Sequence, residues 1–244
     1  METTRESGER PTVVLVHGAW ADALSWQGVI PILQRERYRV VAVENPLTSF
    51  AEDVTTTRRL IDAQPGPVVV AAHSYGGAVT TAAAAGRPNV RALVYVTAFA
   101  PDEGEPFSAL LGRFGDSDVI ATLAPDAAGA FYIDPARFNE VFAGGLPVEQ
   151  ASVMGAAQKP LAGAIFGASV EGAPAWRTIP SWYVVARNDR VIKPELQRFM
   201  AQRMGARVSE LDASHVAYVS HPTEVARLID EVASSVATGA VAAT

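Results

Sequence analysis

Cysteine is absent from the 244-residue chain. Its absence excludes disulfide scaffolds, thiolate metal sites and cysteine nucleophiles. Basic runs are scarce too: no more than two Lys or Arg residues stand together, and the net charge is −6. The positive surface that nucleic-acid phosphates or anionic lipids require is therefore not expected. We predict neither a nucleic-acid partner nor a membrane partner.

Long hydrophobic runs are also missing. No apolar stretch approaches the ~20 residues of a membrane span, and the first ten residues, METTRESGER, lack the apolar centre of a signal peptide. We therefore expect a cytoplasmic protein. Hydrophobic residues nevertheless make up 49% of the chain, which is enough for a sizeable core. Residues 1–10 are expected to form a disordered lead, and the low-complexity residues 234–244 a flexible tail.

Six short apolar runs, rich in β-branched residues, predict the strands of a mostly parallel α/β sheet. They occupy residues 12–16, 38–43, 67–72, 91–98, 181–186 and 207–211. Most of them do not alternate, as expected for strands covered by helices on both faces. Helices are predicted between them. Ser49 begins a capping box for a helix to about Ala63, and Pro194 and Pro222 suit the first turns of helices to about Met204 and Ser234.

This alternation stops between residues 103 and 178. The segment contains scattered Gly and Pro, many aromatic residues and no convincing strand pattern. A structureless loop of this length is implausible inside a compact domain. We therefore predict a helical cap, or lid, over residues 103–178, inserted in a core of residues 11–102 and 179–233.

The strongest local motif is AHSYGG at residues 72–77, directly after an apolar strand and directly before a helical pattern. A serine held at a sharp strand-to-helix turn needs small residues two positions away on either side, as in G-x-S-x-G. Ala72 replaces the first glycine of that pattern. The motif favours Ser74 as a nucleophile, and the alternative is a serine that only caps the helix.

A serine nucleophile needs a base, and the chain has four histidines. His215 lies just past the last predicted strand and is the predicted base. His17 and His73 flank the Ser74 turn and are expected to shape the loops by hydrogen bonding. His221 precedes Pro222 and is expected at the start of a helix.

The acid of the triad should follow a strand and precede the histidine. Asp189 meets both conditions and would hold the imidazole in the useful tautomer. Asp102 is an alternative, because it could reach the same histidine from the neighbouring strand. Asp212 is a weaker alternative, because it lies too close to His215 in sequence to face it easily.

The sequence VHGAW at residues 16–20 ends the first strand, and its loop could aim a backbone N–H at a developing oxyanion. The second donor would be the N–H of Tyr75, at a helix N-terminus. This loop, Ser74, Asp189 and His215 all follow the carboxyl ends of predicted strands. In a parallel sheet these ends share one edge, which is where sites form.

Other chemistries are poorly supported. The chain has no phosphate-binding G-x-x-x-x-G-K-[ST] motif, no dinucleotide fingerprint after a strand, and no His pair at i, i+4. We therefore expect no metal and no cofactor. The aromatic cap suggests a small or medium apolar substrate, with Trp20, His73, Phe107 and Phe131 as candidate contacts.

Together the motifs resemble the α/β-hydrolase superfamily, from about Thr12 to Ser234. The nearest likeness is to its small cofactor-free branch of bacterial esterases, plant methylesterases and hydroxynitrile lyases. It is carried by VLVHGAW at 14–20, AHSYGG at 72–77, ARNDRVIKP at 186–194 and SHVAYVSHP at 214–222. The resemblance implies a six-stranded sheet with a helical cap. It also implies that Ser74 is the nucleophile, His215 the base and Asp189 the acid, and that Ala19 and Tyr75 donate the oxyanion N–H groups.

The expected activity is hydrolysis of small to medium apolar carboxylic esters through an acyl-enzyme on Ser74. Many hydroxynitrile lyases of this branch carry a lysine directly after the catalytic histidine, and here that position is Val216. The missing lysine disfavours cyanohydrin cleavage, but some lyases of the branch lack it, so cleavage of a C–C bond stays an alternative. A metabolite-tailoring reaction on the same triad is another. An alternative of another class is a receptor-like protein that binds a ligand and turns it over slowly. Both a monomer and a homodimer are compatible with the sequence.

Overall fold

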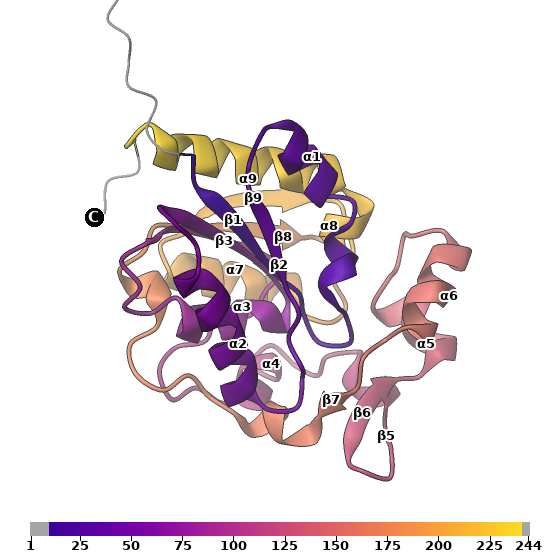
Figure 1. Cartoon of the computed structure of the whole chain (residues 1–244). Helices are drawn as coiled ribbons and strands as arrows, with labels where there is room; N and C mark the ends of the chain where they lie inside the picture. Colours follow the sequence, from indigo (N-terminus) through magenta and orange to yellow (C-terminus); the bar gives the residue numbers. More distant parts are fainter. Residues whose placement is uncertain (1–9, 241–244) are drawn as a thin grey trace, which may run out of the picture.

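The computed structural model describes residues 10–240, so most of the predicted lead and the last four residues of the predicted tail lie outside the described residues. A six-stranded sheet with the order β2-β1-β3-β4-β8-β9 runs through the centre of the molecule (Figure 1). Every neighbouring pair of its strands is parallel. The strands are β1 (Thr12–Val16), β2 (Val40–Val43), β3 (Val68–His73), β4 (Val90–Val96), β8 (Ser181–Ala186) and β9 (Arg207–Leu211).

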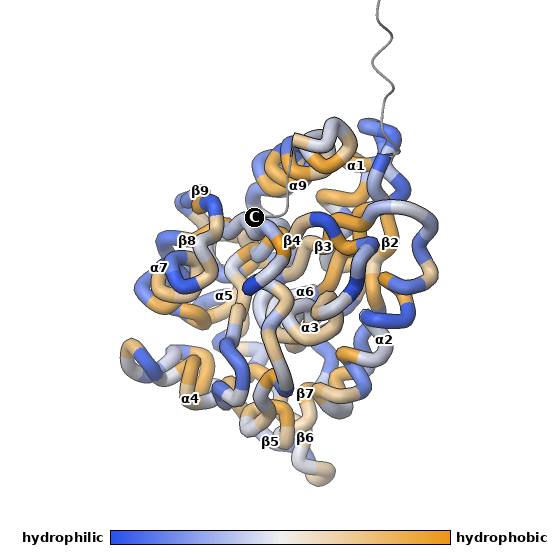
Figure 2. The backbone as a smooth tube through the Cα atoms, turned by 90° about the vertical axis from the view of Figure 1, so that its left-hand side faces the viewer, coloured by the Kyte–Doolittle hydropathy of each residue, from blue (hydrophilic) through white to orange (hydrophobic). Residues whose placement is uncertain are grey.

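The sheet forms the core because its inner strands are apolar on both faces. Every residue of β1, β3 and β8 is buried, and Figure 2 shows β3 largely in orange, the hydrophobic end of its scale. Strand β9, at the edge, is mostly exposed and carries charged residues. The predicted mostly parallel six-stranded sheet is therefore confirmed. Within residues 10–240, no helix combines the length and the apolar character needed to cross a membrane.

Helices cover both faces of the sheet. On one face α1 (Ile30–Arg35) packs against α9 (Pro222–Ala237), which follows the short α8 (Ala217–Ser220). On the other face lie α2 (Phe50–Asp62), α3 (Tyr75–Ala83) and α7 (Pro194–Arg203) (Figure 1). This division follows from right-handed crossovers: connections that run toward β9 place their helices on one face, and the connection from β1 back to β2 places α1 on the other.

The helix starts agree with the sequence signals. The Ser49 hydroxyl accepts a hydrogen bond from the Glu52 N–H at 3.2 Å, which caps α2. Pro194 and Pro222 occupy the first turns of α7 and α9. The last helix continues to Ala237, so residues 234–237, which were predicted to belong to the flexible tail, are helical. Residues 234–237 stay helical because the apolar face of α9 still packs there, with Val236 against the core.

The segment 103–178 extends beyond the carboxyl ends of the strands, and its middle part, residues 123–162, lies at the lower right of Figure 1. As expected it contains helices: α4 (Phe107–Leu111), α5 (Pro135–Val141), α6 (Val148–Ala156) and 3₁₀ turns at Ile120–Thr122, Gly163–Gly167 and Ala175–Arg177. It also contains an antiparallel sheet that the sequence did not predict, with β5 (Leu123–Pro125), β6 (Ala130–Ile133) and β7 (Leu161–Ala162). The β5–β6 turn is held by the Asp126 carboxylate, which accepts the N–H groups of Ala128 and Ala130. The cap is therefore mixed rather than purely helical.

Candidate active site

Ser74 stands at a strained turn between β3 and α3. Its φ of 51° and ψ of −126° lie in a region that non-glycine residues rarely adopt. The glycines that follow permit the turn. A Cβ on Gly76 would lie 2.4 Å from the carbonyl oxygen of His17, and a Cβ on Gly77 would lie 2.4 Å from that of Phe99. The Gly-Gly pair of the motif therefore allows α3 to start directly against the ends of β1 and β4.

The Ser74 hydroxyl lies within hydrogen-bonding distance of His215, which in turn contacts Asp189. Ser74 Oγ is 2.8 Å from His215 Nε2, and His215 Nδ1 is 2.8 Å from Asp189 Oδ2. All three side chains are buried. The structure thus brings together the predicted nucleophile, base and acid, from the ends of β3, β9 and β8. A proton on Nδ1 donated to Asp189 leaves Nε2 free to accept the serine proton.

Both carboxylate oxygens of Asp189 are fully engaged. Oδ1 accepts the backbone N–H groups of Val191 and Ile192, at 2.7 and 3.0 Å. Oδ2 accepts the side-chain amide of Gln197 at 2.8 Å as well as the imidazole of His215. Gln197 is fully buried on α7, and its own oxygen accepts the N–H of Ala186 at 3.0 Å. Sequence analysis missed Gln197. A polar residue on the buried face of a helix that starts a few residues after the acid is the signal that could have found it.

Two side chains fix the backbone of His215. Its carbonyl oxygen accepts the Thr97 hydroxyl at 2.7 Å and the Nε2–H of His73 at 3.0 Å. Thr97 follows β4 and has a positive φ of 45°, which turns its hydroxyl toward the loop. Burial lowers the pKa of His73 well below its usual value, so this imidazole is neutral and acts as a donor. The expectation that His73 shapes a loop by hydrogen bonding fits these contacts.

The alternative acids lie elsewhere. Asp102 forms an ion pair with Arg177, a residue of the cap. Asp212 has a side chain that is 78% exposed, and it pairs with Arg187 at 3.0 Å. Neither carboxylate forms a hydrogen bond with His215, whose Nδ1 partner is Asp189.

The backbone N–H of Ala19 belongs to the loop after β1, and that of Tyr75 belongs to the first residue of α3, next to Ser74. Neither donates to a protein acceptor within residues 10–240. Gly18 lets the loop after β1 approach closely, since a Cβ there would lie 2.7 Å from that of Ser74. The Gly18 carbonyl accepts Nδ1–H of His17 at 2.8 Å, and that carbonyl belongs to the same peptide unit as the Ala19 N–H. His17 therefore holds the plane of the peptide that carries the first predicted oxyanion donor.

The tautomer of His17 follows from its second contact. Its Nε2 accepts the backbone N–H of Asn45 at 3.0 Å, so the proton sits on Nδ1. Burial lowers the pKa of His17, which keeps the ring neutral and this arrangement intact.

The side chain of Tyr75 is held by a hydrogen bond to Asp53 of α2. Its hydroxyl donates to Asp53 Oδ2 at 2.7 Å, and Asp53 Oδ1 accepts the N–H of Leu47 at 2.9 Å. Burial raises the pKa of Asp53, and the bond from Tyr75 opposes that rise. Burial and the neighbouring carboxylate raise the pKa of the Tyr75 phenol. Tyr75 therefore remains a neutral donor that ties the start of α3 to α2.

An apolar space of about 40 Å³, here called the inner cavity, opens onto Ser74. No charged side chain lines it among the described residues. Its walls come from both core and cap: Ala19, Trp20, Ser74, Tyr75, Phe99, Phe107, Leu111, Val119, Leu161, Ile165, Phe166 and Val191.

Two of the four candidate substrate contacts, Trp20 and Phe107, line this cavity. Phe131 does not line it, but its carbonyl oxygen accepts the indole N–H of Trp20 at 3.0 Å. His73 does not line it either, so its expected contact with substrate is not supported. Successive residues of a strand point to opposite faces, which sends the His73 ring behind Ser74 toward Tyr218.

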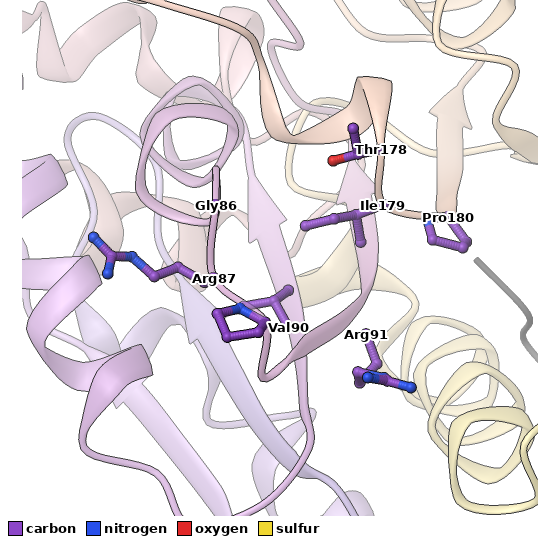
Figure 3. A pocket seen from close by; sticks show the side chains of 8 residues that line it. Gly86, Arg87, Val90, Arg91, Thr178, Ile179 and Pro180 are labelled. Carbon is purple, nitrogen blue, oxygen red and sulfur yellow. The ribbon is translucent and has the colours of Figure 1, made fainter. Parts of the chain in front are cut away.

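A larger hollow of about 410 Å³ lies between the starts of β4 and β8. Figure 3 shows Arg87 and Arg91 extending in opposite directions around it. It is at the amino end of the strands, whereas the sites of parallel sheets form at the carboxyl ends. It is therefore not part of the candidate active site.

The sequence of the chain is similar to those of known proteins. The sequence model of the alpha/beta hydrolase family matches residues 13–228. A probable hydrolase from Phoma sp. is 27% identical, over 92% of this chain and 98% of its own. Methylesterase 9 from Arabidopsis thaliana is 26% identical, over 87% of this chain and 94% of its own.

Solved structures show the same fold. The crystal structure of a pyrethroid hydrolase from Sphingobium faniae superposes with a TM-score of 0.76. It is 23% identical in sequence, and the match covers 91% of this chain and 97% of the other. The resemblance inferred from the motifs is thereby confirmed at the level of family and fold.

Proposed function

The chain belongs to the alpha/beta hydrolase family, and from this premise we propose that it is a serine hydrolase that cleaves carboxylic esters through an acyl-enzyme on Ser74. One observation carries the proposal. The side chains of Ser74, His215 and Asp189 form a continuous hydrogen-bonded relay at the strained turn after β3. The esterase names of its relatives, such as Methylesterase 9, support the same class of reaction.

In the first half of the reaction, Ser74 Oγ attacks the ester carbonyl carbon while His215 Nε2 takes the serine proton. Asp189 accepts Nδ1–H and stabilises the imidazolium that forms. The carbonyl oxygen becomes an oxyanion, which accepts the N–H groups of Ala19 and Tyr75. The carbon–oxygen bond to the alcohol then breaks, and His215 gives its proton to the departing alcohol.

In the second half, a water molecule attacks the acyl group on Ser74. His215 takes a proton from this water, and the same two N–H groups bind the second oxyanion. The acid leaves when the bond to Ser74 Oγ breaks, and the proton returns from His215 to the serine. The proposed chemistry uses no cofactor.

The inner cavity supports a small to medium apolar substrate. Its lining contains aliphatic and aromatic side chains, and the phenol of Tyr75 is already bonded to Asp53. A charged group placed there would lose its hydration without gaining a partner, which is costly. We therefore propose uncharged esters as substrates.

The test is the initial rate of hydrolysis of p-nitrophenyl esters, from acetyl to decanoyl, by the wild type and by Ser74→Ala. We expect Ser74→Ala to lose about 10⁵-fold or more in kcat while remaining folded. A p-nitrophenyl phosphonate should add covalently to the wild type at Ser74, as measured by peptide mass spectrometry.

Ser235→Ala is the matched control, because Ser235 lies on α9 and donates its hydroxyl to the carbonyl of Val232. It should keep the wild-type rate and leave the phosphonate adduct at Ser74. Ester hydrolysis that persists in Ser74→Ala, or a folded wild type that hydrolyses none of these esters, would contradict the proposal.

A further inference from the structure

A second apolar hollow, here called the outer groove, lies between the loop after β1 and the cap helices α5 and α6. Its volume is about 390 Å³, compared with about 40 Å³ for the inner cavity. The cap contributes walls from Phe138, Phe142, Val153 and Met154, and the core contributes Leu24 and Val219. Leu24 and Val153, one from each side, are 70% and 69% exposed. The groove is therefore an apolar surface that solvent reaches.

Trp20 stands at the border of the two spaces. It lines both of them, although only 5% of its surface is exposed. Its indole N–H is bonded to the carbonyl of Phe131, and its ring meets the edge of Phe142 with centroids 6.0 Å apart. Its backbone has a φ of 58°, a conformation that bulky residues rarely adopt and that surrounding contacts must maintain. Trp20 is thus a wall shared by the two spaces and held in place by the cap, and an ester that reaches both spaces would lie along its ring.

The two spaces differ in how they meet the triad: the inner cavity is lined by Ser74 itself, whereas the outer groove meets the triad through Phe142, which packs on His215. The inner cavity touches Ser74 and the predicted oxyanion donors, but His215 is not among its lining residues. Phe142, a wall of the outer groove, packs against His215 with ring centroids 5.0 Å apart. In the mechanism above, His215 gives its proton to the departing alcohol. An ester with its acyl group in the inner cavity would therefore have its alcohol oxygen beside His215, and Phe142 is the His215 contact that also borders the outer groove.

We infer that the outer groove binds the alcohol half of the ester and that the inner cavity accepts only a short acyl group. The inference rests on the proposed function and adds a second binding site to it. The inner cavity has room for roughly three water-sized groups, which suits an acetyl or propionyl chain. The substrate class is short-acyl esters of bulky, uncharged, apolar alcohols.

The polarity of the outer groove agrees with this class. Its central walls are aliphatic and aromatic, and polar residues such as Gln27 and Gln150 stand among its lining. Asp22 also borders the groove, and its carboxylate accepts the N–H of Ser25 at 3.1 Å. An alkyl or aryl alcohol gains apolar contact along the walls, whereas a methyl ester leaves the whole groove unused.

Two isomeric esters test the assignment of the two sides. Octyl acetate has a short acyl group and a long alcohol, and methyl nonanoate has the reverse. Both have the same formula and leave as simple alkyl alcohols, so their intrinsic reactivities are similar. We expect kcat/KM for octyl acetate to exceed that for methyl nonanoate by about tenfold or more, from the apolar area that only octyl acetate buries. Acid release in a pH-stat measures both reactions.

Val153→Asp tests the groove itself. The aspartate would place a charge beside the octyl chain and raise KM for octyl acetate by about tenfold, with KM for ethyl acetate unchanged. Val148→Asp is the matched control, because Val148 lies on the same helix, is 73% exposed and does not line the groove. It should leave KM for both esters unchanged.

The outcomes separate the inference from the proposed function. Ser74-dependent hydrolysis that favours methyl nonanoate overturns the inference and leaves the proposed function standing. An equal KM for octyl acetate in Val153→Asp and Val148→Asp also overturns it. If neither isomer nor any p-nitrophenyl ester is hydrolysed in a Ser74-dependent way, the proposed function fails first and the inference fails with it.

Discussion

The turn around Ser74 and the cap over it are built in different ways. In the core, Asp189 accepts four hydrogen bonds and the His215 carbonyl accepts two, all from buried groups. The cap, in contrast, exposes large apolar side chains at Phe114, Ile120, Val148 and Val153. It meets the site through aromatic packing and through isolated contacts such as that of Trp20 with Phe131.

This difference indicates that the core determines whether an ester is turned over, and that the cap determines which ester is preferred. Buried polar groups with complete partners have one arrangement, because any other leaves a donor or an acceptor unpaired. Apolar contacts tolerate changes of shape at small cost as long as volume is conserved. We therefore expect substitutions in the core to abolish turnover, and substitutions in the cap to change which ester is turned over.

The largest expected effect comes from comparing two aspartates. Asp189→Asn removes the acceptor that holds the His215 tautomer, and we expect kcat to fall by about 10⁴-fold. Asp102→Asn loses only its ion pair with Arg177 of the cap, in which both side chains are partly exposed, and kcat should change less than about twofold. Steady-state rates on p-nitrophenyl acetate measure both. The reverse ranking would transfer the acid role to Asp102.

The second comparison uses two glycines. Gly76→Ala would press a methyl group against the carbonyls of His17 and Val16. We therefore expect the free energy of unfolding to fall by about 3 kcal/mol, together with a loss of activity. Gly167→Ala, in the cap, meets no atom within 4 Å and should leave stability nearly unchanged. Urea denaturation of the two variants measures the difference. Equal stabilities would show that the Ser74 turn can relax, contrary to the close packing described above.

The third prediction concerns acid. The chain has histidines at 17, 73, 215 and 221 and none in the cap. Burial lowers the pKa values of His17 and His73 below the usual 6.5. Below that pH the unfolded chain binds protons that the folded chain does not, so the free energy of unfolding falls as the pH falls. Each histidine contributes a slope of at most about 1.4 kcal/mol per pH unit.

His73→Gln should remove one of these two contributions. Its side-chain amide keeps a donor for the His215 carbonyl but cannot take up a proton. Urea titrations between about pH 6.5 and pH 5 should therefore give a lower slope than in the wild type, with the difference approaching about 1.4 kcal/mol per pH unit toward pH 5. Identical slopes would mean that His73 is protonated in the folded protein, and the neutral donor described above would be wrong.

The sequence predicted the core well because its signals are local. Strand β1 occupies residues 12–16 as expected, since an apolar β-branched run is typical of a strand buried on both faces. Ser74, Asp189 and His215 could be chosen because each follows a strand, and parallel strands end at a common edge. Thr97 also follows a strand, and Gln197 lies on the buried face of the helix after the acid, but neither feature tells which atom the side chain binds. Folding brings the His215 carbonyl to Thr97 and the Asp189 carboxylate to Gln197.

The cap was predicted less completely. Strands of two to four residues, such as β7 at Leu161–Ala162, are too short to show the alternation that identifies a strand. Their pairing depends on a turn at Asp126 and on contacts with the core, including the bond from the Ala162 N–H to the carbonyl of Leu47 at 3.0 Å. The extent of the cap is visible in the sequence as a loss of pattern, but its internal architecture is not.

The smallest expected effect lies where the cap meets the polar network of the core. Lys159, in the cap, donates to the Glu44 carboxylate and to the carbonyl of Asn45, the latter at 2.6 Å. Asn45 in turn donates its N–H to His17, which holds the Ala19 peptide. Lys193, the only other lysine, also joins core to cap, by donating to the carbonyl of Phe114 at 3.3 Å, but it has no bond to Asn45 or His17.

Replacing either lysine with methionine keeps an apolar stem and removes the charge. Lys159 is 25% exposed and its partner Glu44 is 55% exposed, so we expect Lys159→Met to lower stability by less than about 1 kcal/mol. It should raise KM for octyl acetate about two- to threefold, because the cap is held less firmly over the substrate, and leave kcat for ethyl acetate unchanged. Lys193→Met, the matched control, should leave both values unchanged. A fall in kcat for ethyl acetate in Lys159→Met but not in Lys193→Met would mean that Lys159 acts through Asn45 and His17 on the oxyanion donors. The cap would then affect the chemical step as well as selectivity, contrary to the division proposed here.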